Sequence, residues 1–213
     1  MNIQQISQSF YKGAQTPVAW LRSAERLRDA AEVILSHEQQ FEIPFFRACD
    51  LATQQATAIA YSEGNKSGSA EIECSPPNYP PAQLLYAYAI ENVLKGILVA
   101  NNPSLANENK LNKSLLSHDL NALARMADFQ VYVQETPVLD ALSKLSVWAG
   151  RYPVASRRSE SSGAKNSDEL LDWGSQNLIV RQFFARGAVG LENKIDKSPT
   201  RFGAIVVFRQ PGT

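Results

Sequence analysis

PAQLLYAYAIENVLKGILVA, at residues 81–100, carries apolar side chains on nearly every side of a helical projection. A helix of this kind must be surrounded by other elements, because its apolar faces would otherwise lie in water. Its few polar residues, Glu91, Asn92 and Lys95, form a narrow stripe at helical spacing. Glu91 and Lys95 are four residues apart in the order that favours an ion pair. We expect a central buried helix whose polar stripe is either an ordinary ion pair at a helix interface or a strip facing a site or a partner subunit.

Two helices are expected before this segment. Thr16-Pro17 is a helix-start signature, in which threonine caps free amides and proline takes the first helical position. Its apolar stripe comprises Leu21, Ala24, Leu27, Ala31, Ile34 and Leu35. The second helix is expected from near Pro44, and its apolar face comprises Phe45, Phe46, Cys49, Ala52, Ala56 and Ile59. On this face Cys49 is interpreted as a packed core thiol. Residues 63–81, rich in Gly, Ser, Asn and Pro, predict a long loop.

Further helices are expected downstream of the central segment. Ser117 is expected to cap a helix that runs to Ala127, and Thr136-Pro137 opens another that stops at Gly150. Residues 156–167 predict a flexible linker. The last helix is expected over residues 167–195, bent or broken at its glycines. The segment RFGAIVVFR, residues 201–209, predicts a short strand or an arm that packs on a neighbour.

These patterns predict an all-α protein, an up-and-down helical bundle with a long inter-helix loop and a short C-terminal arm. We expect one domain over residues 1–195 and a tail or arm over residues 196–213. With 44% hydrophobic residues, the chain has enough apolar side chains to form a core without disulfides. Cys49 and Cys74 show no metal-ligand spacing, and no metal or cofactor is expected.

The charge balance and the ends of the chain bear on location and partners. Lysine plus arginine and aspartate plus glutamate each total 21, and a net charge of zero argues against a dedicated polyanion binder. The opening MNIQQISQSF has no basic end followed by a long apolar stretch, so we expect no signal peptide, and no apolar run approaches the length of a membrane span. We expect a soluble, cytoplasmic protein with no membrane association.

Three segments together resemble the HEPN domain family. YAYAIENVLKGILVA is similar to the family's central helix, SHDLNAL to the His-Asp-Leu start of the next helix, and WAGRYPV to an Arg-Tyr-Pro ending. The last two are typical of the branch related to the C-terminal domain of sacsin. The order and spacing of the segments also fit, and the resemblance covers residues 80–155. It implies a HEPN-like fold and commonly a homodimer paired through helices.

The resemblance implies two kinds of function. Many HEPN proteins are RNA-cleaving toxins or defence effectors that use an arginine followed four to six residues later by a histidine. Neither His37 nor His118 has an arginine at that spacing upstream. The branch with the His-Asp-Leu and Arg-Tyr-Pro segments is linked instead to nucleotide binding or partner contacts. By this comparison the candidate contacts are His118, Asp119, Arg151 and Tyr152, to which Glu91 and Lys95 add the polar stripe.

Each candidate also has a structural interpretation. His118 at a helix start suits proton transfer or a phosphate contact, or else capping and packing. The Asp119 carboxylate complements the helix dipole in the first turn. Arg151 complements the dipole at the end of a helix, and its planar guanidinium group also suits phosphate binding. Tyr152 stacks on a base or packs at the helix end. A basic segment with Arg157, Arg158 and Lys165 is either a phosphate or RNA contact or a solvated loop.

Three hypotheses remain open from the sequence. The first is a non-catalytic HEPN-like module that binds a nucleotide, RNA or a protein partner as a homodimer, in a prokaryotic defence or toxin-antitoxin context. The second is a metal-independent endoribonuclease with a non-standard site built from His118, Glu91 and Arg151. The third is a structural helical interaction protein. Fold analogy alone cannot choose among them.

Overall fold

The computed structural model describes residues 14–64, 67–106, 111–149 and 173–197. Over these ranges the fold is all-α, as the sequence predicted, and the one β-type pairing is an isolated bridge between Ala106 and Leu111. The α-helices are α2 (Pro17–Glu38), α3 (Glu42–Glu63), α4 (Pro80–Asn101), α5 (Leu120–Met126), α6 (Thr136–Lys144) and α8 (Trp173–Lys197). Single turns of 3-10 helix are η1 (Gln39–Phe41), η2 (Pro103–Leu105) and η3 (Lys113–Leu116), and η4 (Leu145–Ala149) is a π turn.

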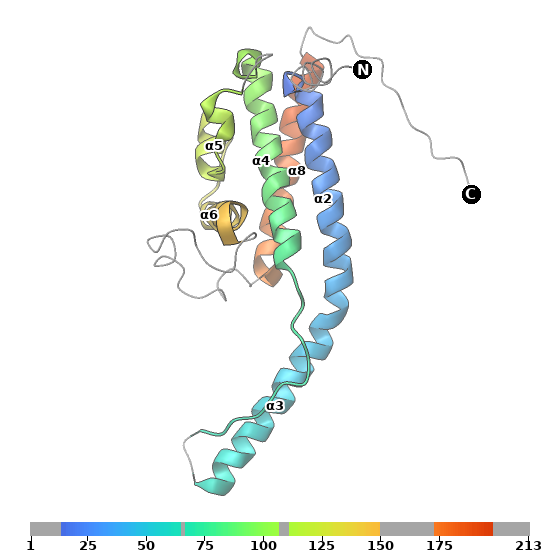
Figure 1. Cartoon of the computed structure of the whole chain (residues 1–213), viewed down its shortest axis with the longest axis vertical. Helices are drawn as coiled ribbons and strands as arrows, with labels where there is room; N and C mark the ends of the chain where they lie inside the picture. The colour runs from blue at the N-terminus through green and yellow to red at the C-terminus, as the bar shows by residue number, and fades with distance from the viewer. Residues whose placement is uncertain (1–13, 65–66, 107–110, 150–172, 198–213) are drawn as a thin grey trace, which may run out of the picture.

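Helix α4 is the centre of the bundle, with α2 and α8 on one side and α5 and α6 on the other (Figure 1). Every residue from Val93 to Val99 is buried, and this run covers nearly two turns, so its side chains point to all sides of the helix. The apolar surface of this helix therefore requires neighbours all round, as its sequence predicted.

The apolar stripe of α2 packs against α4. Leu21, Ala24, Ala31 and Leu35 are buried there, which confirms the predicted stripe. The helix begins at Pro17 as expected, but the Thr16 side chain makes no capping hydrogen bond. The backbone instead closes the first turn, through a bond from the Ala19 N–H to the Thr16 carbonyl at 2.9 Å.

Helix α8 runs unbroken through Gly187 and Gly190, contrary to the expected break. A methyl group added at Gly187 would lie 2.7 Å from Val93 Cγ1, so this glycine allows close approach of α8 to α4. Small residues at a helix contact shorten the distance between axes, and this contact outweighs the weak helix propensity of glycine. The described part of the helix spans Trp173–Lys197, and its expected start, the expected linker over residues 156–167 and the tail lie outside the described residues.

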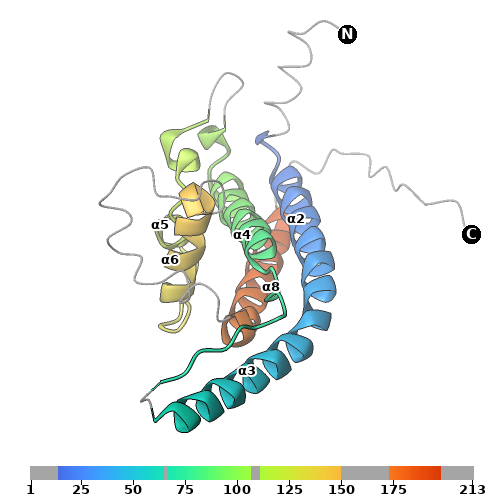
Figure 2. The same cartoon turned by 60° about the horizontal axis from the view of Figure 1, so that its bottom comes forward.

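Helix α3 does not pack into the core, which corrects the sequence expectation. It follows α2 after the short η1 turn and extends beyond the bundle (Figures 1 and 2). Ala52 is its one buried residue, Cys49 is half-buried and Phe46 is exposed. The returning chain covers only part of the predicted apolar face, near Ala56: a methyl group added at Gly68 would clash with the Ala56 carbonyl oxygen.

A polar network joins three helices of the bundle. Glu32 on α2 accepts hydrogen bonds from Arg181 on α8, 2.7 Å from Nε to Oε1, and from the Tyr86 hydroxyl on α4. Burial alone would raise the pKa of Glu32, but the hydrogen bonds from Arg181 and Tyr86 and the nearby guanidinium charges outweigh it and lower that pKa. Burial and the bond to Glu32 raise the pKa of Tyr86. The network fixes the positions of α2, α4 and α8 along the bundle axis relative to one another.

A second polar contact attaches the loop between α5 and α6 to α8. The Arg186 guanidinium donates to both carboxylate oxygens of Glu135, at 2.6 and 2.8 Å, and lies over the Tyr132 ring at 4.5 Å from its centroid. The Glu135 carboxylate also accepts from the Tyr132 backbone N–H at 2.8 Å. Both bonds come from one guanidinium nitrogen, Nη2, and charge-assisted hydrogen bonds of this kind are stronger than neutral ones.

Candidate functional site

The polar stripe of α4 forms a buried ion pair. Lys95 Nζ lies 2.6 Å from Glu91 Oε1, and the two side chains are 6% and 10% exposed. The sequence spacing predicted this pair. The Lys95 ammonium is directed at the carboxylate rather than at solvent, so in this structure Lys95 provides the countercharge for Glu91.

The second oxygen of the same carboxylate contacts His118. Glu91 Oε2 lies 2.9 Å from His118 Nδ1, and the histidine side chain is 42% exposed. Since a carboxylate only accepts hydrogen bonds, Nδ1 carries the proton in this contact. The other ring nitrogen, Nε2, forms no hydrogen bond with the described residues. The imidazole is therefore held by one edge and open at the other.

The start of α5 holds His118 in place. Asp119, the next residue, is the N-cap of α5, and its Oδ1 accepts from the Ala122 backbone N–H at 2.8 Å. Its carboxylate therefore satisfies a free amide of the first turn. The sequence predicted Ser117 as the cap of this helix, and that prediction is wrong. The Ser117 hydroxyl oxygen instead accepts a hydrogen bond from the Asp119 N–H at 3.2 Å. The Leu120 N–H donates to Ser143 Oγ of α6 at 2.9 Å.

Other polar residues near the stripe have structural partners. Asn92 Nδ2 donates to the Tyr88 carbonyl at 2.8 Å, so this side chain turns back to its own helix. The buried Asn121, which the sequence did not single out, donates to the Thr136 carbonyl at 3.1 Å and to Asp140 Oδ1 at 2.7 Å. Its amide joins α5 to α6 and thereby supports the backbone beside His118.

Three of the six predicted site residues thus meet at one carboxylate: Glu91, Lys95 and His118. Asp119 is adjacent in the chain, but its side chain is used in the cap. Arg151 and Tyr152 lie outside the described residues, as do Arg157, Arg158 and Lys165. The structure therefore describes the α4 and α5 part of the predicted site.

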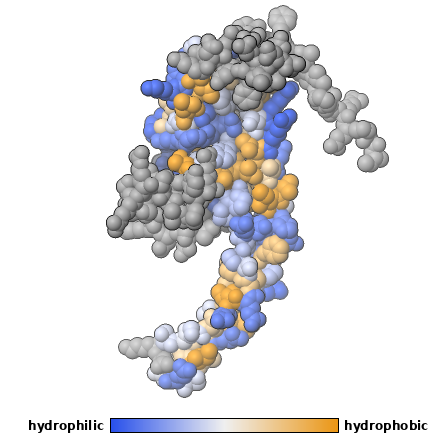
Figure 3. Space-filling view, in the orientation of Figure 1, coloured by the Kyte–Doolittle hydropathy of each residue, from blue (hydrophilic) through white to orange (hydrophobic). Residues whose placement is uncertain are grey.

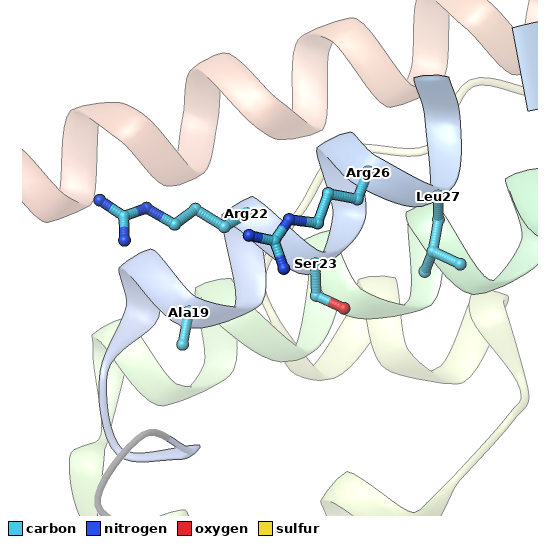
Figure 4. A pocket seen from close by; sticks show the side chains of 5 residues that line it. All are labelled: Ala19, Arg22, Ser23, Arg26 and Leu27. Atoms are coloured by element: carbon cyan, nitrogen blue, oxygen red, sulfur yellow. The ribbon is translucent and has the colours of Figure 1, made fainter. Parts of the chain in front are cut away.

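A separate pair of arginines lies on the outer side of α2. Arg22, Ser23 and Arg26 line an open pocket with Ala19 and Leu27, and the two guanidinium groups extend in the same direction along the helix (Figure 4). In the described part of the chain neither arginine forms an ion pair. From the sequence, the mixed charges of α2 were interpreted as a solvated face, and the sequence gave no signal that these two arginines form no ion pair in the described part of the chain.

The described residues contain no group of three or more His, Cys, Asp or Glu side chains arranged to hold a metal ion. None of the helices in the described ranges combines the length and apolar character that crossing a membrane requires. No protein-family model, curated protein or solved structure matches this chain.

Proposed function

We propose that the chain is a HEPN-like binding module without catalytic activity, and that it binds a nucleotide or RNA through a phosphate at His118. The contact between Glu91 and His118 carries the proposal. With both ring nitrogens protonated, Nδ1–H donates to Glu91 and Nε2–H is left to donate to an anionic oxygen. A ring already fixed at one edge loses less freedom on binding than a mobile side chain.

The charges around His118 also support an anionic ligand. The Glu91 carboxylate is buried, and its charge is matched by Lys95 at 2.6 Å. A ligand phosphate at Nε2 therefore meets a paired carboxylate behind the ring rather than an exposed negative charge. Arg151 and Tyr152, which the family resemblance adds, bring a phosphate fork and a stacking surface to the same proposal.

Thermal unfolding with added ATP and with short single-stranded RNA tests this function, because a ligand that binds only the native state raises the melting temperature. We expect such a rise for the wild type and its loss in His118→Ala. His37→Ala is the matched control, since it removes the other histidine from the exposed end of α2 and should keep the full rise. The absence of a rise with every ligand, or an equal rise in His118→Ala, would contradict the proposal.

The same contact favours endoribonuclease activity as a second candidate. A carboxylate that fixes a histidine is the arrangement of an oriented general base, which RNA cleavage uses to deprotonate the 2′-hydroxyl. The missing arginine–histidine motif weighs against it, because charge on the phosphate must also be stabilised. We expect no cleavage of end-labelled RNA by the purified protein. Cleavage that is abolished in His118→Ala would reverse the order of the two candidates.

A further inference from the structure

Helix α3 is an arm that lies apart from the bundle. Within the described residues it packs on η1 and on the chain that returns over residues 67–79, and it forms no extensive contact with α4, α5, α6 or α8. Figures 1 and 2 show it extending from the lower end of α2. The side that faces the returning chain includes the buried Ala52 and the half-buried Ala56. The opposite side has no neighbour among the described residues.

That open side carries large apolar residues. Tyr61 is 89% exposed and Phe46 is 62% exposed, and Ile43 and Leu51 are more than half exposed. At 3.6 residues per turn, these four and Ala58 fall within about 140° of the helix circumference. Figure 3 shows hydrophobic residues among hydrophilic ones along the arm. Single exposed apolar residues are ordinary on protein surfaces, but several on one face of one helix indicate an interaction surface.

The pattern of this face fits a second copy of the same helix. Two α3 helices can run antiparallel about a two-fold axis that crosses them at the height of Ala52. Each residue then lies opposite the residue of the second copy whose number brings the sum of the two to 104. The facing pairs are then Ile43 with Tyr61, Phe46 with Ala58, and Asp50 with Gln54. Large residues meet small or aromatic ones, and the carboxylate meets an amide that can donate to it. Such an isologous contact closes as a dimer.

Charge disfavours parallel pairing in register. Parallel pairing in register would place Arg47 against Arg47 and Asp50 against Asp50, and like charges that face each other are unfavourable. In the antiparallel arrangement Arg47 faces Thr57 and no like charges meet. The chain as a whole has zero net charge, so two copies do not repel each other over long range.

The geometry of the arm leaves room for the pairing. The 22 residues of α3 span about 33 Å. In an antiparallel pair the bundle end of each arm meets the far end of the other, so the two bundles lie at opposite ends. We propose that α3 is the dimerisation arm of this protein and pairs antiparallel with α3 of a second copy. This proposal is independent of the ligand proposed at His118.

Light scattering of the full chain at micromolar concentration tests the pairing. We expect twice the chain mass of 23.5 kDa, falling to 23.5 kDa in Phe46→Glu. Val133→Glu is the matched control, because Val133 is 90% exposed in the loop between α5 and α6, and it should keep the doubled mass. Circular dichroism checks that both variants fold. A wild type of 23.5 kDa, or a doubled mass that persists in Phe46→Glu, would overturn the proposal.

Disulfide trapping tests the direction of the helices. In a chain with Cys49 and Cys74 changed to serine, Asp50→Cys and Gln54→Cys are made as separate variants and then mixed. The antiparallel arrangement predicts crosslinking across the mixture and little in either variant alone, because equal positions lie several residues apart and exceed disulfide range. Crosslinking of Asp50→Cys to itself at least as strong as in the mixture would overturn the antiparallel pairing.

Discussion

Replacing Glu91 with leucine should cost this protein a large part of its stability. Leucine fills most of the volume of Glu91, but it leaves the ammonium of Lys95, whose side chain is 6% exposed, without a countercharge. Removing one partner of a buried ion pair typically costs about 3–5 kcal/mol, against about 5–15 kcal/mol of total stability for a domain. His118 adds little to this cost, because its half-exposed ring regains hydrogen bonds from water.

The double variant Glu91→Leu/Lys95→Met separates the unpaired charge from the loss of packing. Both changes replace polar side chains with apolar ones of similar volume, which in buried pairs is often neutral or stabilising. We therefore expect the double variant to recover most of the loss. Urea unfolding is the measurement, read as a lower midpoint at unchanged slope for the single variant. A loss below about 1 kcal/mol, or a double variant as unstable as the single one, would refute the burial argument.

Three further predictions concern the bundle. Because the pKa of Glu32 is lowered in the folded protein, the Glu32 carboxylate stabilises the fold fully above the ordinary carboxyl pKa of 4.5, and this stabilisation is lost as the pH falls through the folded-state pKa. Urea midpoints measured above and below that pH range should therefore fall less in Glu32→Gln than in the wild type. Gly187→Ala should lower the melting temperature by steric overlap. Gly190→Ala should raise it through helix propensity, because an added methyl group would lie 3.6 Å from Phe129 Cε2, an ordinary van der Waals contact. Asp119→Ala should cost about 1 kcal/mol in chemical unfolding through the lost cap of α5; an unchanged midpoint would contradict that role.

Local patterns predicted the parts of the fold that depend on neighbours in sequence. The stripe of α2 and the ion pair of Glu91 with Lys95 follow from helical spacing alone, and both are present. The contact of His118 with Glu91 spans 27 residues, and that of Arg181 with Glu32 spans 149. No spacing rule relates residues at such separations, because the contacts arise only when the helices pack.

The misassigned face of α3 has a different cause. Periodicity identifies an apolar face but does not identify what covers it. Ala52 and Ala56 are covered by the returning chain, which approaches closely enough that Gly68 has no room for a side chain. Phe46 lies on the other side, where the described chain supplies no cover. The sequence therefore revealed that α3 has apolar residues, while only the structure separates an internal surface from an exposed one.

The polar stripe on α4 is easier to explain as support for His118 than as a source of stability. A buried lysine–glutamate pair is seldom more stable than apolar residues of the same volume, so stability alone gives no reason for it in a helix this apolar. The second oxygen of Glu91 is directed at His118, and it fixes an imidazole that would otherwise rotate freely at the surface. The double variant Glu91→Leu/Lys95→Met distinguishes the two explanations. If it keeps its stability yet loses the melting-temperature rise with ATP or RNA, the pair positions the histidine. If it keeps both, the pair is an ordinary ion pair at a helix interface and the proposed site loses its basis.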